Sequence, residues 1–466
     1  MRIKSVKTPS ASTLIYFAST KDDKTGIQDF KGEVKEVAVR YAEETTCIYC
    51  GIGNPEGVDA HILRTAAALG IQKSIDLKRH DVSVIPGRYG SFDEAIVEGI
   101  CLGGYSFTKY KREKPSVIRT VELCDGSLKP SDIANITALC SAVNYARDLV
   151  NDNAHVVTPQ HLADEAMLFK KDKNITVKVI NEKELERIGC GLLSAVGRGS
   201  PYPPRLIIIE YRGAPNSKKV RAVVGKGITF DTGGLNLKKE GGIETMRCDM
   251  AGTAAVLGMI SACSALKLKT NVIGVCACAH NAIDGNSYFV GDVYTAYNGT
   301  TVEINNTDAE GRLALADAIA YVQKQYTLDT VIDLATLTGG VLTALGDLSA
   351  GLFANSEPLA DALTRASQST GERLWRLPMY QEYSDSLKGD ISDLRNLSKL
   401  KRGQASSIIG AVFIRHFVEP NVAWAHLDIA GTAWNEYSSR GDVPQYATGY
   451  GVRLLVEYLR GVQEKR

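Results

Sequence analysis

The chain has 466 residues, of which 44% are hydrophobic and 23% are charged, and its formal net charge is +1 at pH 7. This length predicts two or three domains, because single domains usually hold about 100–200 residues. The near-zero charge argues against a dedicated nucleic-acid-binding protein, whose binding domain is usually strongly basic. The composition is ordinary for a soluble globular protein.

Ten cysteines are spread along the chain, mostly in apolar surroundings, and this usage is typical of a reducing compartment. Cys47-x-x-Cys50 resembles half of a redox or zinc motif, but no second such pair accompanies it, so we interpret both as core residues. We find neither the apolar segment of a signal peptide nor an apolar run approaching the ~18 residues of a membrane span. A soluble, cytoplasmic protein is therefore expected.

Strand-like and helix-like runs alternate over residues 1–130, which predicts a small N-terminal α/β domain without visible chemistry. The expected strands cover 13–18, with the first strand starting as early as Ser10, and also 36–39 and 46–51, while the expected helices cover 57–69 and 91–102.

Residues 131–155 are expected to link this domain to a second one at 156–466. Apolar residues recur at helical spacing from Pro130 to Val150, and a polar, turn-rich stretch follows from Asn151 to His155. Thr158-Pro159 then fits a helix N-cap with proline at the first helical position.

Continuous aliphatic runs in the second domain indicate strands that are buried on both faces of a sheet. Strands are expected at 176–180, 205–211, 220–224, 271–279, 330–334 and 422–427, and helices at 159–170, 182–188, 251–266, 313–324, 358–369 and 406–417. This order predicts a three-layer α/β/α domain with a mostly parallel, mixed sheet.

The chemistry centres on the stretch from Asn305 to Leu313, where Asp308 and Glu310 precede an Ala-rich helical run. In an extended segment the side chains at positions i and i+2 point the same way, so these two carboxylates can converge. A capping box formed by Thr307-x-x-Glu310 explains the stretch equally well.

Lys226, Asp231, Lys238 and Asp249 lie upstream in two glycine-bracketed loops, with Lys226 following the expected strand 220–224. Open α/β sheets form their sites beyond the carboxyl ends of strands. Taken singly, Asp231 fits an Asx-turn and Asp249 a helix cap.

The four carboxylates Asp231, Asp249, Asp308 and Glu310 would bring four negative charges together, which two divalent cations would cancel. Oxygen ligands suit manganese or magnesium, and zinc is also possible. From the residues alone, a two-metal phosphatase or nuclease remains an alternative, although only Lys238 and Arg312 are obvious phosphate-binding groups. A DNA-binding role is a third hypothesis, which the net charge disfavours.

The run Asn306-Thr307-Asp308-Ala309-Glu310-Gly311-Arg312-Leu313 closely resembles the hallmark of the leucyl aminopeptidase (cytosol aminopeptidase) family of two-metal exopeptidases. Further segments resemble the same family: 224–234 with Lys238, 249–252, 333–339, 425–431 and 448–453. The resemblance covers most of residues 140–466, whereas residues 1–130 match no motif and correspond only to the family's smaller, variable domain.

This resemblance implies two divalent ions, Mn²⁺ or Zn²⁺, whose ligands would be Lys226, Asp231, Asp249, Asp308 and Glu310. Asp231 and Glu310 would contact both ions, Asp249 would complete the tighter site and Asp308 the looser one. Lys226 would bind through its neutral amine, and a salt bridge to Asp231 or Asp249 is the alternative role for it. A hydroxide that bridges the metals would attack the scissile carbonyl.

Two further roles follow from the resemblance. Lys238 would stabilise the oxyanion, and Arg312 would hold a bicarbonate ion that acts as general base, with a salt bridge to a nearby acid as the alternative. The substrate-binding residues would be Met246, Asn306, Thr336, Leu337, Gly339, Ala430 and Ala433. Because Ala433 is small, a preference for leucine and other large apolar N-terminal residues is expected.

The resemblance also implies peptide substrates and a homohexamer. We expect neither a membrane partner nor a nucleic-acid partner.

Overall fold

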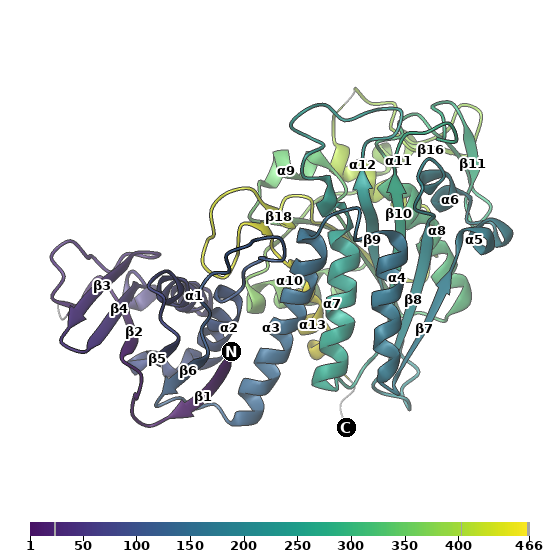
Figure 1. Ribbon diagram of the computed structural model, residues 1–466. Coiled ribbons are helices and arrows are strands. Elements are labelled where there is room, and N and C mark those ends of the chain that lie inside the picture. Colours follow the sequence, from purple (N-terminus) through teal and green to yellow (C-terminus); the bar gives the residue numbers. More distant parts are fainter. Residues whose placement is uncertain (23–24, 402, 464–466) are drawn as a thin grey trace. The chain divides into compact units, whose positions relative to one another are not determined.

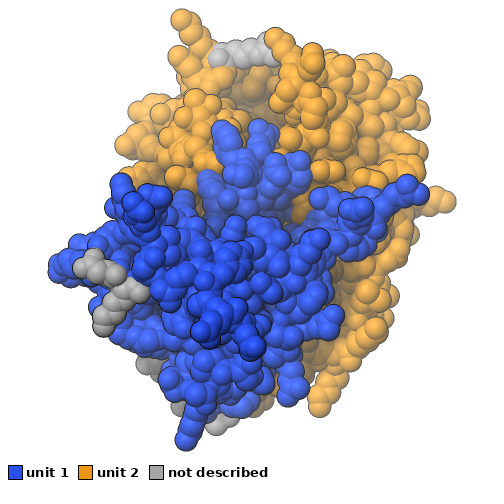
Figure 2. All heavy atoms as spheres, turned by 60° about the vertical axis from the view of Figure 1, so that its left-hand side comes forward, with its two compact units in different colours: residues 1–144, 435–448 blue, residues 145–434, 449–466 orange. Residues whose placement is uncertain are grey.

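The computed structural model describes residues 1–22, 25–401 and 403–463. Within it the chain divides into two compact units (Figure 2), of which the first comprises residues 1–144 and 435–448 and the second comprises residues 145–434 and 449–466. The division falls inside helix α3 (Pro130–Asn151). The boundaries at 130 and 155 stay a prediction.

The first unit contains a six-stranded sheet in the order β1-β6-β5-β2-β4-β3. All neighbouring strands are parallel except β3 and β4, which are antiparallel. The elements are β1 (Arg2–Val6), β2 (Thr13–Ala18), β3 (Val37–Ala42), β4 (Thr45–Gly51), α1 (Ala60–Asp76), β5 (Asp81–Ile85), α2 (Asp93–Gly103) and β6 (Thr120–Cys124).

Strand β2 confirms the prediction for 13–18, but it is not the first strand. The sequence analysis missed β1, which pairs in parallel with β6. The reason is that β1 has no fully buried residue, so it lacks the apolar pattern of the inner strands.

An eight-stranded sheet in the order β15-β14-β17-β13-β9-β10-β8-β7 forms the centre of the second unit (Figure 1). The four middle strands β17, β13, β9 and β10 are mutually parallel, whereas β14, β8 and β7 run antiparallel to their inner neighbours. The bounds are β7 (Ile175–Ile180), β8 (Arg205–Arg212), β9 (Arg221–Asp231), β10 (Asn271–Asn281), β13 (Thr330–Ala335), β14 (Ala350–Ala354), β15 (Leu374–Arg376) and β17 (Ala423–Asp428).

Helices cover both faces of this sheet, as predicted. The helices α6, α8 and α12 share one buried apolar core with residues of β9 and β10, and α7 packs against β9, β10 and α13, which in turn contacts α10. The bounds are α4 (Pro159–Leu168), α5 (Glu182–Ile188), α6 (Gly191–Gly197), α7 (Ala251–Leu266), α8 (Gly311–Gln325), α9 (Gly339–Leu345), α10 (Glu357–Thr370), α11 (Gln381–Asp385), α12 (Ser406–Arg415) and α13 (Val452–Gly461).

Smaller sheets complete the second unit and the segment 435–448. Strands β11 (Val293–Thr295), β12 (Thr301–Glu303) and β16 (Leu394–Arg395) form one sheet, and β18 (Trp434–Asn435) pairs with β19 (Tyr446–Ala447).

The helical stretch Met246–Leu266 is long and apolar enough to pass as a membrane span, with a mean hydropathy of 1.4, but 78% of that window is buried inside the protein. The sequence analysis had not singled it out, because Arg247 and Asp249 interrupt the apolar run. Its packing against β9 and β10 is that of a core helix.

Strand β9 is longer than predicted. It continues through Lys226 and ends at Asp231, whereas the sequence analysis ended the strand at Val224 and placed both residues in a following loop. The glycine at 225 was read as a strand end, but it marks a close approach of two backbones: a Cβ there would lie 2.6 Å from the carbonyl carbon of Gly252.

Candidate metal centre

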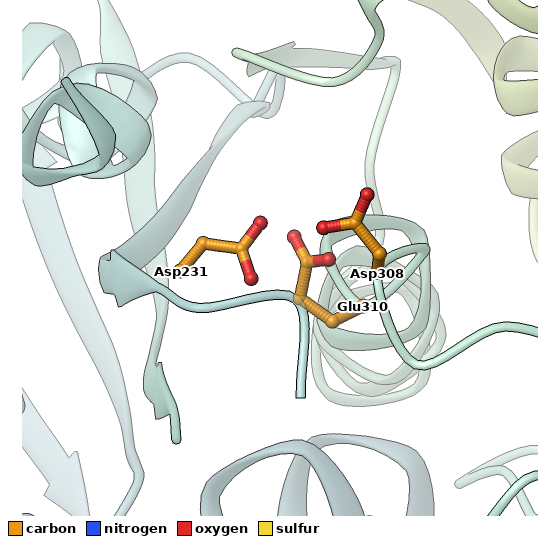
Figure 3. Close-up of side chains that lie close together, drawn as sticks. All are labelled: Asp231, Asp308 and Glu310. Atoms are coloured by element: carbon orange, nitrogen blue, oxygen red, sulfur yellow. The ribbon is translucent and has the colours of Figure 1, made fainter. Parts of the chain in front are cut away.

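Three carboxylates converge beyond the carboxyl end of β9 (Figure 3). One ligand oxygen from each of Asp231, Asp308 and Glu310 lies within 4.8 Å of the other two. Asp231 is the last residue of β9, Asp308 lies in the loop before α8, and Glu310 directly precedes that helix. The predicted convergence of positions 308 and 310 is therefore present, and β9 contributes the third carboxylate.

Lys226 joins the fourth carboxylate to this cluster. Its Nζ lies 2.8 Å from Oδ1 of Asp249 and 2.9 Å from Oε1 of Glu310, and it donates a hydrogen bond to the carbonyl of Thr336 at 2.9 Å. Gly311 makes room for this side chain, since a Cβ there would lie 2.5 Å from Cε of Lys226. The salt bridge weighed as the alternative role of Lys226 is thus formed with Asp249.

Lys238 provides a second cation on the other side of the cluster. Its Nζ lies 2.8 Å from Oδ2 of Asp231 and 2.5 Å from Oδ1 of Asp308. The side chain of Lys238 is 17% exposed and that of Lys226 only 3%. Two ammonium groups against four carboxylates leave two negative charges without a counter-charge in the immediate cluster.

Burial and mutual repulsion act on these carboxylates. The pKa of Asp231 rises to about 6 because of burial and the nearby charge of Glu310. Burial also raises the pKa of Asp249 well above its usual range, against the lowering effect of Lys226. Oδ2 of Asp249 and Oε2 of Glu310 are buried and accept no hydrogen bond from the described residues. Buried carboxylate oxygens without donors are the arrangement that a bound cation would satisfy.

The capping box expected as an alternative at Thr307-x-x-Glu310 is not formed. Helix α8 has no side-chain capping bond, and the Thr307 hydroxyl donates instead to the carbonyl of Gly233 at 2.7 Å. The cap expected at Asp249 is also absent, since α7 has no side-chain cap. The Asx-turn of Asp231 is present: its Oδ1 accepts from the Gly233 amide at 2.9 Å, in addition to its place in the cluster.

The sequence analysis missed Asn281, the last residue of β10, whose side chain connects two segments of the site by hydrogen bonds. Its Nδ2 donates to Oδ1 of Asp231 at 2.8 Å and to the carbonyl of Thr307 at 3.1 Å. It is fully buried. Its position at the carboxyl end of a strand beside β9 was the available signal, but that signal depends on knowing that β9 and β10 are neighbours.

Arg312 is the second residue of α8, lies beside the cluster and is only 6% exposed. Its Nη1 donates to the carbonyl of Asn396 at 2.9 Å, its Nε has no hydrogen-bond partner, and no described carboxylate lies within 4.0 Å of it. The salt bridge weighed as the alternative role of Arg312 is therefore not formed among the described residues. Burial lowers the pKa of Arg312 to about 10.

The residues expected to bind substrate occupy different surroundings. Thr336 donates to Oδ1 of Asp249 at 2.8 Å. Asn306 lines a pocket of about 280 Å³ together with Arg312, whereas Ala433 is 3% exposed and lines a small alanine-rich cavity of about 10 Å³.

The other four expected substrate-binding residues lie on neighbouring segments. The amides of Leu337 and Ala430 both donate to Oδ1 of Asp428, at 3.1 and 3.4 Å, which ties the ends of β13 and β17 together. Gly339 begins α9, and Met246 begins the short helical turn that carries Asp249.

Two family models match the sequence. The catalytic domain of the cytosol aminopeptidase family matches residues 144–456, and the N-terminal domain of that family matches residues 26–114. The chain belongs to the cytosol aminopeptidase family.

Curated relatives agree with this family membership. A probable cytosol aminopeptidase of Protochlamydia amoebophila (strain UWE25) is 39% identical over 447 residues, which cover 93% of this chain and 89% of the relative. A probable cytosol aminopeptidase of Geobacter sulfurreducens is 44% identical over 372 residues, which cover 78% of this chain and 74% of the relative.

Solved structures share the fold across the whole chain. The bottromycin maturation enzyme BotP in complex with Mn has a TM-score of 0.89 at 31% identity and covers 98% of this chain and 100% of its own. A mutant of tomato leucine aminopeptidase has a TM-score of 0.90 at 29% identity and covers 99% of this chain and 96% of its own. The chain is therefore a peptidase of a metal-dependent aminopeptidase family, with the two-domain α/β fold that the sequence predicted.

Proposed function

We propose that this aminopeptidase removes N-terminal residues from peptides with a preference for leucine and other large apolar residues, and that two divalent ions support the reaction. The observation that carries the proposal is the convergence of Asp231, Asp308 and Glu310 within 4.8 Å, with Asp249 linked through Lys226. The unpartnered oxygens of Asp249 and Glu310 support the binding of cations at this place.

The five residues that would hold the ions are Lys226, Asp231, Asp249, Asp308 and Glu310. When bound, two such ions would polarise the scissile carbonyl and lower the pKa of the attacking water from 15.7 to about 7. Oxygen-rich ligation suits Mn²⁺, and Zn²⁺ also accepts these ligands. To act as a ligand, Lys226 would exchange its ion pairs with Asp249 and Glu310 for contact with a metal and would lose its proton.

Lys238 would stabilise the negative charge that develops on the substrate carbonyl oxygen. It is the more exposed of the two lysines and already lies against the carboxylate cluster. One such donor typically contributes about 3–4 kcal/mol to the transition state.

Arg312 would hold a bicarbonate ion that receives the proton of the attacking water. Its buried Nε has no hydrogen-bond partner among the described residues, and a guanidinium fork matches a planar anion. Arg312 also lines a pocket of about 280 Å³, which supports this role.

Specificity for the N-terminal residue would come from two sources. A free α-amine can approach the metal centre as a ligand, whereas an acylated amine has lost that ability. The side chain of this residue would meet Met246, Thr336, Leu337, Gly339, Ala430 and Ala433, with Asn306 on the other side of the scissile bond. The small side chain of Ala433 favours large apolar residues.

A cytoplasmic location and a homohexameric assembly belong to the same proposal. The naming of the relatives as cytosol aminopeptidases supports the location. Multi-angle light scattering of the purified protein would test the assembly.

The decisive experiment is hydrolysis of leucyl-p-nitroanilide by metal-stripped protein, with and without added Mn²⁺ or Zn²⁺. Metal-dependent release that disappears when the substrate amine is acetylated is the expected result. Absence of release with either metal, combined with hydrolysis of p-nitrophenyl phosphate, would replace the proposal with a two-metal phosphatase.

A further inference from the structure

The pocket of about 280 Å³ beside the carboxylate cluster has an unusual charge balance for its position. Two of its lining residues, Arg312 and Lys401, are cationic, and none of its described lining residues carries a carboxylate. Leu397, Leu400 and Ile409 contribute apolar surface. The pocket is thus positively charged, although it adjoins a cluster that is rich in negative charge.

The pocket adjoins the metal centre through the chain segment that carries two of its carboxylates. Asn306 and Arg312 both line the pocket, and they stand on either side of Asp308 and Glu310 in the sequence. The backbone amide of Asp308 also donates to Oδ1 of Asn306 at 2.9 Å. A peptide held by its amine and scissile carbonyl at the cluster therefore has this pocket beside it.

Neither cation of the pocket forms an ion pair with a carboxylate of the described residues. The Arg312 guanidinium is buried and retains an Nε without a partner. No described carboxylate lies within 4.0 Å of Nζ of Lys401, although its neighbour Lys399 pairs with Asp390 at 2.6 Å. Unpaired cations in a partly enclosed pocket attract anionic groups.

We propose that Lys401 makes the enzyme prefer peptides whose leaving residue carries a carboxylate, with that residue lying in this pocket. The inference rests on the proposed aminopeptidase function and names the substrate class of the same site. The carboxylate has two possible sources: the α-carboxylate of a dipeptide, or the side chain of an aspartate or glutamate in second position.

Size and reach agree with such a ligand. One extended residue spans about 3.3–3.6 Å. The α-carboxylate of the leaving residue is therefore about one residue length from the carbonyl carbon that is attacked. The volume lies just below the ~300–1,000 Å³ of pockets that enclose drug-sized ligands, which suits one or two residues. The three apolar residues offer contact to the remainder of the leaving group.

The test compares kcat/KM within two substrate pairs for the metal-loaded enzyme. Leucyl-glycine against leucyl-glycinamide reports on the α-carboxylate. Leucyl-aspartic acid α-amide, whose side-chain carboxylate is free, against leucyl-asparagine amide reports on the side chain. We expect the carboxylate member of at least one pair to be preferred. In Lys401→Gln this preference should fall about three- to fivefold, as for one ion pair with an exposed lysine, and mainly through a higher KM.

Two variants serve as controls. Lys401→Arg keeps the charge and should keep the preference. Lys399→Gln removes the same charge two residues away, on a side chain that pairs with Asp390 and does not line the pocket, and should leave the preference within about twofold of wild type.

The outcomes separate the two proposals. Three outcomes would overturn the role of Lys401 and leave the proposed aminopeptidase function standing. Wild type could hydrolyse all four peptides without a preference, the preference could persist in Lys401→Gln, or it could fall equally in Lys399→Gln. If metal-loaded wild type hydrolysed none of the peptides and no leucyl-p-nitroanilide, the proposed function would fall and this inference with it.

Discussion

Asn281 and Asp231 are joined by a 2.8 Å hydrogen bond between the last residues of two adjacent parallel strands. The same amide nitrogen donates to the carbonyl of Thr307, so one side chain ties β9 to the loop that carries Asp308. The pairing register shifts between Ala279 and Asn281, and such an irregularity re-aims the side chain that follows. The carboxylate of Asp231 is therefore oriented by a residue outside the cluster.

Replacing Asn281 with alanine should weaken metal binding by about 10- to 100-fold, as for other residues that orient a metal ligand. Titration calorimetry of Mn²⁺ into metal-stripped protein measures this directly. Asn271 is a matched control, because it is a buried asparagine at the opposite end of the same strand, bonded to Ala214 and Ser217. Asn271→Ala should reduce stability and leave the metal affinity unchanged; an equal loss of affinity in both variants would contradict the role of Asn281.

Replacing Lys238 with alanine should lower kcat by about 10²–10³-fold at saturating Mn²⁺, because a donor to the developing oxyanion is lost. Steady-state kinetics with leucyl-p-nitroanilide measures this loss, and KM should change far less than kcat. The adjacent Lys239 is exposed and takes no part in the cluster, so Lys239→Ala should retain wild-type kinetics. A Lys238→Ala variant with unchanged kcat and a raised KM would assign Lys238 to ground-state binding instead.

Replacing Ala433 with methionine should reduce kcat/KM for phenylalanyl-p-nitroanilide more than for leucyl-p-nitroanilide. Ala433 borders a cavity of only about 10 Å³, so a longer side chain has to occupy space on the substrate side or displace its neighbours. The ratio of the two kcat/KM values, compared between wild type and variant, provides the measurement. An unchanged ratio would remove Ala433 from the side-chain pocket.

Glu122, in the first unit, should make stability depend on pH in the acid range. Burial would raise its pKa, but hydrogen bonds from Ser10 and Ser83 and the nearby Lys4 outweigh this effect and lower the pKa from 4.5 to about 2. A depressed folded-state pKa stabilises the fold above the unfolded pKa of about 4.3, and this stabilisation is lost as the pH falls through about 2.

The variant Glu122→Gln should therefore lose about 2–3 kcal/mol of unfolding free energy at pH 7 and approach wild type near pH 2. Urea denaturation at several pH values, followed by a probe in the first unit, measures the difference. Glu56→Gln is the control, because Glu56 pairs with Lys21 where both side chains are well exposed and such a pair contributes ~0–1 kcal/mol. A pH-independent difference between Glu122→Gln and wild type would contradict the ionic origin.

Local sequence patterns predicted the bounds of a helix or strand correctly where the residues of that element themselves determine where it begins and ends. The helices α5 and α7 and the strand β2 begin and end where the sequence predicts, because capping residues, glycine and apolar periodicity mark their ends. The prediction failed for β1, which is polar and is held in place by pairing with β6. It also ended β9 too early, because a glycine that permits close backbone approach looks the same in sequence as a glycine that ends a strand.

By itself, the sequence determined that Asp308 and Glu310 project to one side, since the alternation of side chains is a property of the local backbone. It also determined the family, through motifs that extend over most of residues 140–466. Only the tertiary structure decided that β9 and β10 lie side by side, and hence that Asn281 holds Asp231. It likewise decided that Lys226 lies inside a strand, between Asp249 and Glu310, and that Lys401 shares a pocket with Arg312. These residues are about 20 to 90 positions apart in the sequence, and hydrogen bonds and charge pairs at such separations depend on how the strands are ordered, which no local pattern specifies.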